Sequence, residues 1–182
     1  MAKPNATGDN TFFKERIKKR LLIFPKLKVQ KRWREFVIGF WRRLVKNMEN
    51  IKENLAKFLR ESGRKNISFG RNLAKEYLQI AALDFIYSHK DYGKLVFYGG
   101  SCLKHCHGLP RLSEDLDFVD LRKQIDIGKL AADLKNYFAK TGGIEIKTAI
   151  QKFRIYLKFP VLRDLGLAER GESDLLFLKI EI

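Results

Sequence analysis

The chain has 182 residues, 45% of them hydrophobic, which is enough to bury the core of one domain and leave a smaller appendage. No apolar run approaches the roughly 20 residues that span a bilayer. The polar opening over residues 1–8 lacks the hydrophobic segment of a signal peptide. These features argue against a membrane-spanning or secreted protein and indicate a soluble, cytoplasmic one.

The formal net charge of +16 favours a polyanionic partner, with nucleic acid ahead of an anionic membrane surface.

The positive charge is concentrated in the first part of the chain. Residues 1–70 carry 19 Lys and Arg against 6 Asp and Glu, a net charge of +13, whereas residues 71–182 carry 18 against 15, a net charge of +3. We expect residues 1–10 to be disordered and residues 11–22 to form a short basic helix. The predicted organisation is therefore a basic, mostly helical N-terminal extension over residues 1–70, followed by a core over residues 71–182.

A longer helix is predicted from Phe36 onward, because apolar residues recur there in alternating steps of four and three. This stripe consists of Val37, Trp41, Leu44, Met48, Ile51, Leu55 and Phe58. Such a stripe packs either onto its own domain or onto a partner helix, and we favour the first interpretation. The polar stretch over residues 61–66 ends the helix and marks the boundary.

The core begins with a predicted helix over residues 72–89, in which Asp84 is a lone acid expected to be solvated or to cap the helix. A short apolar strand follows over residues 95–98, then a short helix over residues 101–107 and a second strand over residues 115–119.

The C-terminal part continues with a helix over residues 127–140, which two glycines end. Alternating patterns predict strands over residues 144–150 and 153–159, a polar connection over residues 160–173, and a last strand over residues 175–182. Together these elements predict an α/β (α+β) fold, with a small mixed sheet of about four or five strands and flanking helices.

Two glycines and a serine connect the first strand to its helix. Gly99 and Gly100 adopt backbone angles that other residues resist and leave room for a close ligand. Ser101 opens the helix, whose free N–H groups and dipole attract anions. A turn of this kind is by itself usually only a turn.

Asp115 and Asp117 lie two residues apart on the second strand, so their carboxylates project from the same face, while Leu116 and Phe118 face the core. Two like charges side by side repel each other unless a cation lies between them. A hard divalent cation such as Mg²⁺ fits this requirement. The alternative is an ordinary solvated strand face.

The two cysteines, Cys102 and Cys106, lie four residues apart near His105 and His107. Adjacent residues on one short helix cannot all reach one tetrahedral zinc ion. We therefore interpret them as ordinary helix residues with reduced thiols.

The combination of these motifs resembles a known family. The run FYGGS at residues 97–101 and the run GLPRLSEDLDF at residues 108–118 are similar to the AbiEii/AbiGii-like nucleotidyltransferases, within the DNA polymerase β-type nucleotidyltransferase superfamily. That family contains toxins of type IV toxin–antitoxin and abortive-infection systems. The resemblance is dense over residues 75–118, thinner toward the C-terminus, and does not cover residues 1–70. The family usually has Thr where this chain has Ser101, which keeps the hydroxyl.

The resemblance implies a third carboxylate on a strand beside Asp115 and Asp117. Glu181 is the only acid inside the last strand, and Lys179 lies two residues before it on the same face. The implied catalytic and metal-binding residues are therefore Asp115, Asp117 and Glu181, which would hold two Mg²⁺ ions, with Mn²⁺ as an alternative. The implied nucleotide-binding residues are Gly99, Gly100, Ser101, Lys104, Arg111 and Lys179. For Arg111, a structural ion pair with Glu114 or Asp115 is the alternative.

The resemblance also implies the reaction, which is transfer of NMP from a nucleoside triphosphate to a hydroxyl acceptor with release of pyrophosphate. The basic N-terminal region favours RNA, tRNA in particular, as the acceptor, with a protein hydroxyl as the alternative. An antitoxin protein is expected as a partner. Relatives continue with a helical C-terminal half, so a truncated core is one interpretation. A catalytically idle module that binds nucleic acid or a partner protein is the competing function.

Overall fold

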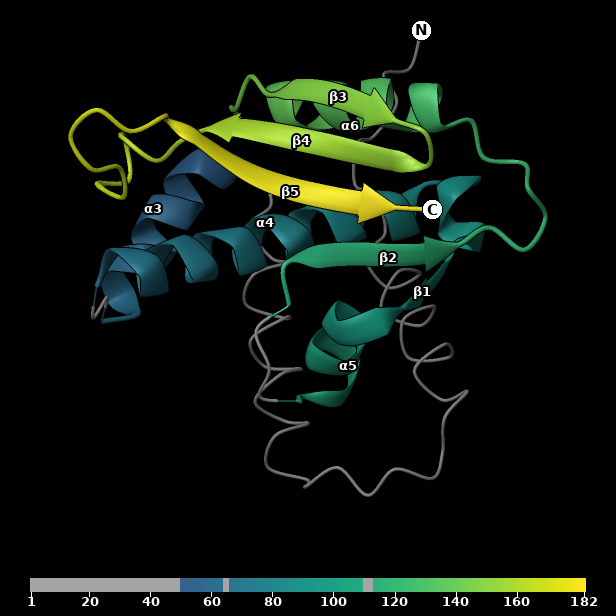
Figure 1. Cartoon of the computed structure of the whole chain (residues 1–182), viewed down its shortest axis with the longest axis horizontal. Coiled ribbons are helices and arrows are strands. Elements are labelled where there is room, and N and C mark those ends of the chain that lie inside the picture. Colours follow the sequence, from purple (N-terminus) through teal and green to yellow (C-terminus); the bar gives the residue numbers. More distant parts are fainter. Residues whose placement is uncertain (1–49, 64–65, 110–112) are drawn as a thin grey trace, which may run out of the picture.

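The computed structural model describes residues 50–63, 66–109 and 113–182 (Figure 1). The helices are α3 (Ile51–Glu61), α4 (Ile67–Ser88), the 3₁₀ helix η1 (Tyr92–Lys94), α5 (Gly99–His107) and α6 (Ile127–Lys140). The strands are β1 (Val96–Tyr98), β2 (Asp115–Val119), β3 (Lys147–Gln151), β4 (Arg154–Pro160) and β5 (Leu175–Glu181). None of the described helices is both long and apolar enough to cross a membrane. The predictions for residues 1–49 lie outside the described residues.

The strands form one five-stranded mixed sheet in the order β1-β2-β5-β4-β3. β5 pairs in parallel with β2, and the other three pairings are antiparallel. The last strand of the chain therefore lies in the middle of the sheet, between β2 and β4 (Figure 1). This arrangement confirms the predicted α/β (α+β) fold with a small mixed sheet and flanking helices.

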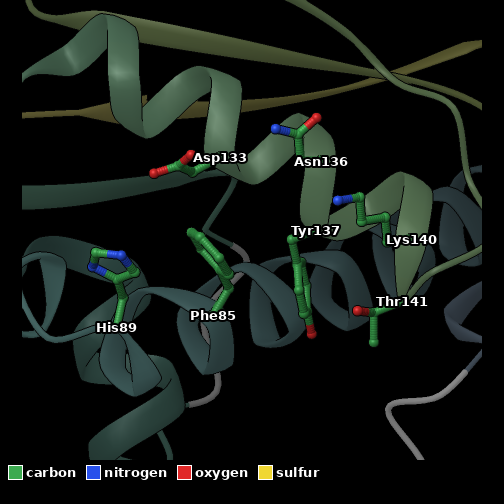
Figure 2. Close-up of a pocket in the computed structure, with 7 residues that line it drawn as sticks. All are labelled: Phe85, His89, Asp133, Asn136, Tyr137, Lys140 and Thr141. Atoms are coloured by element: carbon green, nitrogen blue, oxygen red, sulfur yellow. The ribbon is translucent and has the colours of Figure 1, made fainter.

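Helices α4 and α6 pack on one face of the sheet, α4 against β5 and α6 against β3 and β4. A pocket of about 320 Å³ lies at the surface between these two helices (Figure 2). It is lined by Phe85, His89, Asp133, Asn136, Tyr137, Lys140 and Thr141. The pocket is therefore a feature of the helical layer.

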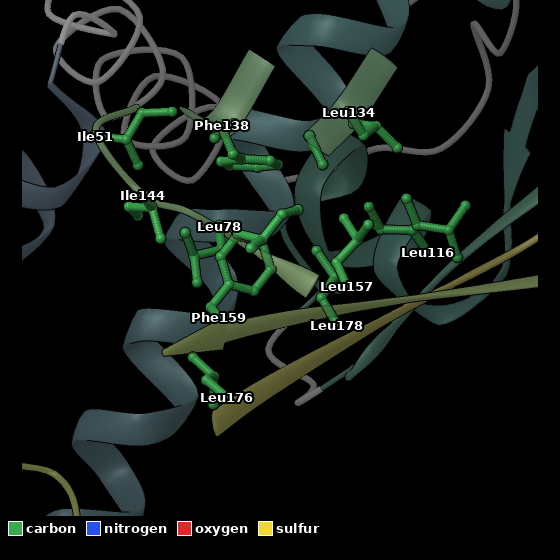
Figure 3. Packing of buried hydrophobic residues seen from close by; sticks show 14 of the residues in the cluster. Ile51, Leu78, Leu116, Leu134, Phe138, Ile144, Leu157, Phe159, Leu176 and Leu178 are labelled. Atoms are coloured by element: carbon green, nitrogen blue, oxygen red, sulfur yellow. The ribbon is translucent and has the colours of Figure 1, made fainter. Parts of the chain in front are cut away.

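The core lies between the helices and the sheet, and alternation along each strand fills it (Figure 3). Leu116 of β2, Leu157 of β4 and Leu178 of β5 are buried and meet the helices. The residues that alternate with them point to the opposite face, where they are half-buried or exposed. A sheet with one packed face leaves the other face for polar side chains.

Helix α3 contributes to this same core. Ile51, Leu55 and Leu59 are buried, and Ile51 lies beside Phe138 and Ile144 in Figure 3. The backbone N–H of Asn50 donates to the carbonyl of Thr141, with the two atoms 2.9 Å apart. The described part of the apolar stripe thus packs onto its own domain. The boundary near residue 70 stays a prediction, because most of residues 1–70 lie outside the described residues.

Several boundaries differ from the sequence prediction. Helix α4 begins at Ile67 rather than at residue 72, because the side chain of Asn66 caps it by accepting from the N–H of Phe69 at 2.8 Å. β3 begins at Lys147, and the buried Ile144 precedes it in a loop. The prediction of a simply polar connection over residues 160–173 is wrong. Three of its residues, Val161, Leu162 and Leu167, enter the core.

The expectation that Asp84 is solvated or caps its helix is also wrong. Asp84 lies on α4 and is half-buried, and burial raises the pKa of its carboxyl to about 6. Tyr137 of α6 is close enough for the charge of Asp84 to add to the effect of burial in raising the pKa of that phenol. Asp84 is thus a carboxyl at the α4–α6 interface.

Replacing Leu55 by Ala tests whether α3 belongs to the domain core. Leu55 has no exposed surface, so the substitution should lower the free energy of unfolding by about 2–5 kcal/mol in a urea titration. Lys57→Ala, on the exposed side of the same helix, should change it by less than about 0.5 kcal/mol. Equal effects of the two substitutions would contradict the assignment.

The raised pKa of Asp84 predicts how stability depends on pH. The folded protein holds this proton more tightly than the unfolded chain, so stability falls as pH rises from near 4 to about 6 and then levels off. Asp84→Asn should remove about 2–3 kcal/mol of this decline relative to the unchanged chain. Urea unfolding of both proteins at pH 4 and pH 7.5 measures the difference, and parallel profiles would contradict the prediction.

Candidate functional site

The pairing of the strands gathers the predicted acids on the face of the sheet that points away from the core. Residues in register share a face. One row across the sheet consists of Tyr98, Asp117, Glu181, Arg154 and Gln151. The next row consists of Asp115, Lys179, Tyr156 and Ala149. Because β5 lies directly beside β2, Glu181 is in register with Asp117 and Lys179 is in register with Asp115.

Two cations pair with these acids. The ammonium of Lys179 lies 2.8 Å from Asp115 Oδ2 and 3.5 Å from Glu181 Oε2. Arg154 Nε donates a hydrogen bond to Glu181 Oε2 at 2.9 Å. The hydrogen bond from Arg154, with the positive charges of Arg154 and Lys179, lowers the pKa of the Glu181 carboxyl. The hydrogen bond to Asp115 raises the pKa of Lys179. Glu181 is therefore ionised and Lys179 is protonated near neutral pH.

Asp117 takes part in none of these ion pairs. Burial raises the pKa of its carboxyl, and the charges of Asp115 and Glu181 raise it further. Three carboxylates thus face two cations, and the negative charge that is left over is centred on Asp117. This is the electrostatic condition that favours an additional cation.

The donor set fits a hard divalent cation in its chemistry, because carboxylate oxygens on two adjacent strands are the ligands that Mg²⁺ takes. Among the described residues, however, no group of three or more His, Cys, Asp or Glu side chains is arranged to hold a metal ion. The ammonium of Lys179 bridges Asp115 and Glu181, and the guanidinium of Arg154 holds Glu181 from the other side. The carboxylate oxygens of Asp115, Asp117 and Glu181 are thus of the chemical type that binds Mg²⁺. In this structure, Asp115 and Glu181 are paired with Lys179 and Arg154.

The glycine turn contacts the acids directly. Gly99 has φ +77°, a left-handed angle that glycine adopts without strain. A Cβ at this position would overlap the carboxylate of Asp117. Gly99 therefore allows α5 to begin against Asp117, with Tyr98 as an N-cap that makes no side-chain hydrogen bond to the helix. We call the three carboxylates of Asp115, Asp117 and Glu181 the acidic row. The first N–H groups of α5 lie next to the acidic row at Asp117.

The hydroxyl of Ser101 is buried and donates to the backbone carbonyl of Asp115. It also lies 2.8 Å from Ser113 Oγ. Ser101 thus connects α5 to β2 and fixes the position of the first turn of α5 relative to Asp115. Its predicted contact with phosphate stays a prediction, as does that of Gly100, which is half-buried at the start of α5.

Lys104, another predicted phosphate-binding cation, pairs with a residue of the helical layer. Lys104 forms an ion pair with Glu76 of α4, so its charge is compensated on the helical side. Arg111 lies outside the described residues. In the same helix, His105 is buried and its Nε2 lies 2.8 Å from Gln79 Oε1, and burial lowers the pKa of the imidazole to about 4. His105 has a structural role between α5 and α4.

Sequence reasoning missed Arg154 as a member of the site. The alternating pattern of β4 places Arg154, Tyr156 and Lys158 on one face, but it does not say which strand lies beside β4. Only the antiparallel pairing with β5 brings Arg154 opposite Glu181. The pocket in Figure 2 contains none of these residues, and we do not assign it to the site.

Replacing Gly99 by Ala tests the contact with Asp117, and Gly171→Ala is the matched control. Both glycines have left-handed backbone angles, at φ +77° and +85°, but an added Cβ at Gly171 meets no atom within 4 Å. Backbone strain should cost each variant about 1–2 kcal/mol of unfolding free energy. Gly99→Ala should lose at least about 1 kcal/mol more from the overlap. Equal losses in urea titrations would contradict the contact.

Comparison with protein-family models matches residues 84–182, more than half of the chain, to the family described as nucleotidyl transferase AbiEii toxin, type IV TA system. The matched range contains the glycine turn, both aspartates and the Lys179–Glu181 ending. Neither the comparison with curated proteins nor that with solved structures gives a match. The chain belongs to the AbiEii family of nucleotidyl transferase toxins of type IV toxin–antitoxin systems.

Proposed function

We propose that the chain transfers NMP from a nucleoside triphosphate to a hydroxyl of RNA, with tRNA as the leading acceptor, in a metal-dependent reaction. The observation that carries the proposal is the parallel pairing of β2 with β5, which sets Glu181 beside Asp117 next to the Gly99 turn. Family membership supports the reaction class and an antitoxin partner. The net charge of +13 over residues 1–70 supports a polyanionic acceptor.

Asp115, Asp117 and Glu181 would hold two Mg²⁺ ions, or Mn²⁺, through carboxylate oxygens. When bound, such ions neutralise charge on the triphosphate and lower the pKa of the attacking hydroxyl. In the reaction, a bond forms between the acceptor oxygen and the α-phosphorus. The bond from that phosphorus to the oxygen bridging the β-phosphate breaks, and pyrophosphate leaves.

The remaining residues would bind and orient the nucleotide. The first N–H groups of α5, at Gly99 and Gly100, have no side-chain cap and suit the β- and γ-phosphates. Ser101 fixes the distance between these N–H groups and the acidic strand through its bond to the Asp115 carbonyl. Lys179 offers an ammonium that can turn from the carboxylates to the triphosphate. Positioning and charge stabilisation supply most of the rate in phosphoryl transfer.

A second candidate is a catalytically idle module that keeps the fold and binds nucleic acid or a partner protein. The ion pairs of Lys179 and Arg154 favour this alternative, because they compensate most of the acidic charge without a metal ion. Transfer of label from an NTP distinguishes the two functions.

Asp117→Asn should abolish transfer while the fold is kept, since the substitution removes a charged oxygen ligand without changing the size of the side chain. We expect at least about a 1000-fold loss of rate, because metal ligation is worth several kcal/mol in the transition state. The assay combines the purified chain with Mg²⁺, each of the four α-labelled NTPs in turn, and bulk tRNA.

Asp164→Asn is the control for this assay. Asp164 is an exposed aspartate in an ion pair with Lys52, remote in sequence from the acidic row. This variant should keep the full rate. Label on protein rather than on RNA would replace the RNA acceptor by a protein hydroxyl. Wild-type turnover in Asp117→Asn would contradict the metal assignment, and no label with any NTP would favour the idle module.

A further inference from the structure

Each of the two basic side chains at the acidic row points at a carboxylate. Lys179 stands in register with Asp115, and its ammonium reaches both Asp115 and Glu181. Arg154 stands in register with Glu181 from the other side and bonds to it at 2.9 Å. Each cation therefore lies on a strand next to the carboxylate that it neutralises.

We propose that Lys179 and Arg154 are built-in counter-ions that compete with a divalent cation for Asp115 Oδ2 and Glu181 Oε2, the carboxylate oxygens with which they pair. The proposal rests on the proposed function, because the ion is the one that the transfer reaction would use. Arg154 is then a positioning residue, which acts on the site through Glu181.

The ion pairs make this competition direct. A carboxylate oxygen that accepts a hydrogen bond from an ammonium or guanidinium has to leave that donor to ligate a metal ion in the same direction. The side chains of Lys179 and Arg154 are 27% and 40% exposed to solvent, so each has room to turn away from its carboxylate. After release, both cations remain beside the acidic row and can face the negative charge of a triphosphate. Metal and nucleotide would therefore bind together more tightly than either alone.

The chain offers a matched control on the same face. Lys158 is two residues along β4 from Tyr156 and lies over the ring of Phe177, with Nζ 5.7 Å from the ring centroid. Removing its charge changes the general electrostatic field of the face without removing a partner of Asp115 or Glu181. A comparison of Lys158 with Lys179 thus separates direct competition from a field effect.

The experiment measures Mn²⁺ binding to the full chain without nucleotide, from the electron paramagnetic resonance signal of the free ion. Lys179→Gln and Arg154→Gln should each tighten Mn²⁺ binding about fivefold or more, since each removes a competing ion pair. Lys158→Gln should change it by less than about twofold, because its charge is farther away and screened by salt.

A second measurement follows the unchanged chain, and the variants serve only to assign its signals. In the unchanged chain with ¹³C-labelled lysine, saturation with Mg²⁺ should shift the side-chain signal of Lys179, which is the signal missing from the Lys179→Gln spectrum. The signal of Lys158 should stay in place. A Lys179 signal that does not move while Mg²⁺ binds would overturn the proposal.

The outcomes separate this proposal from the proposed function. If all chains bind Mn²⁺ equally, or if Lys158→Gln tightens binding as much as Lys179→Gln, the counter-ion role is wrong and the metal-dependent function stands. If neither the unchanged chain nor any variant binds Mn²⁺ without nucleotide, the counter-ion role is wrong, and the transfer assay with Mg²⁺ and NTP decides the proposed function separately.

Discussion

The parallel pairing of β2 with β5 is the interaction on which the rest of this structure depends. It places β5, which is far from β2 in the sequence, in the middle of the sheet, so that β5 completes both the core and the candidate site. On one face, the pairing places Leu116 beside Ile180 in the hydrophobic core. On the other face, the same hydrogen bonds place Asp117 beside Glu181. Loss of the pairing would therefore remove the fold and the site together.

The acidic row carries an electrostatic cost that the chain compensates locally. Like charges on adjacent strands destabilise a sheet unless they are paired. Lys179 and Arg154 supply this pairing from β5 and β4, the two strands that complete the row. The three carboxylates thus remain compatible with a folded domain, because the two cations pair with them. Asp117, with its raised pKa, holds the part of the charge that is not compensated.

Several residues serve the fold and the site at once. Gly99 gives the left-handed turn from β1 to α5 and also leaves the space that the Asp117 carboxylate fills. Ser101 is buried between α5 and β2, and its hydroxyl joins the two elements that frame the site. Helix α3, which precedes the matched family region, adds Ile51 and Leu55 to the core. The nucleotidyl transferase region is therefore supported by a helix that the family comparison does not include.

The sequence by itself determined most of the local elements and the residue types that line the candidate site. The period of two in β2 and β4 and the period near 3.6 in α6 follow from backbone geometry, and the Gly-Gly-Ser turn and the Asp-Leu-Asp strand carry the family resemblance. Tertiary structure alone decided which strand is the neighbour of which. It decided that Arg154 pairs with Glu181, that Lys104 pairs with Glu76 instead of facing the acids, and that Asp84 is half-buried. Alternation tells which face of a strand a residue occupies, whereas the partner across the sheet depends on strand order, which is set by the packing of the whole chain.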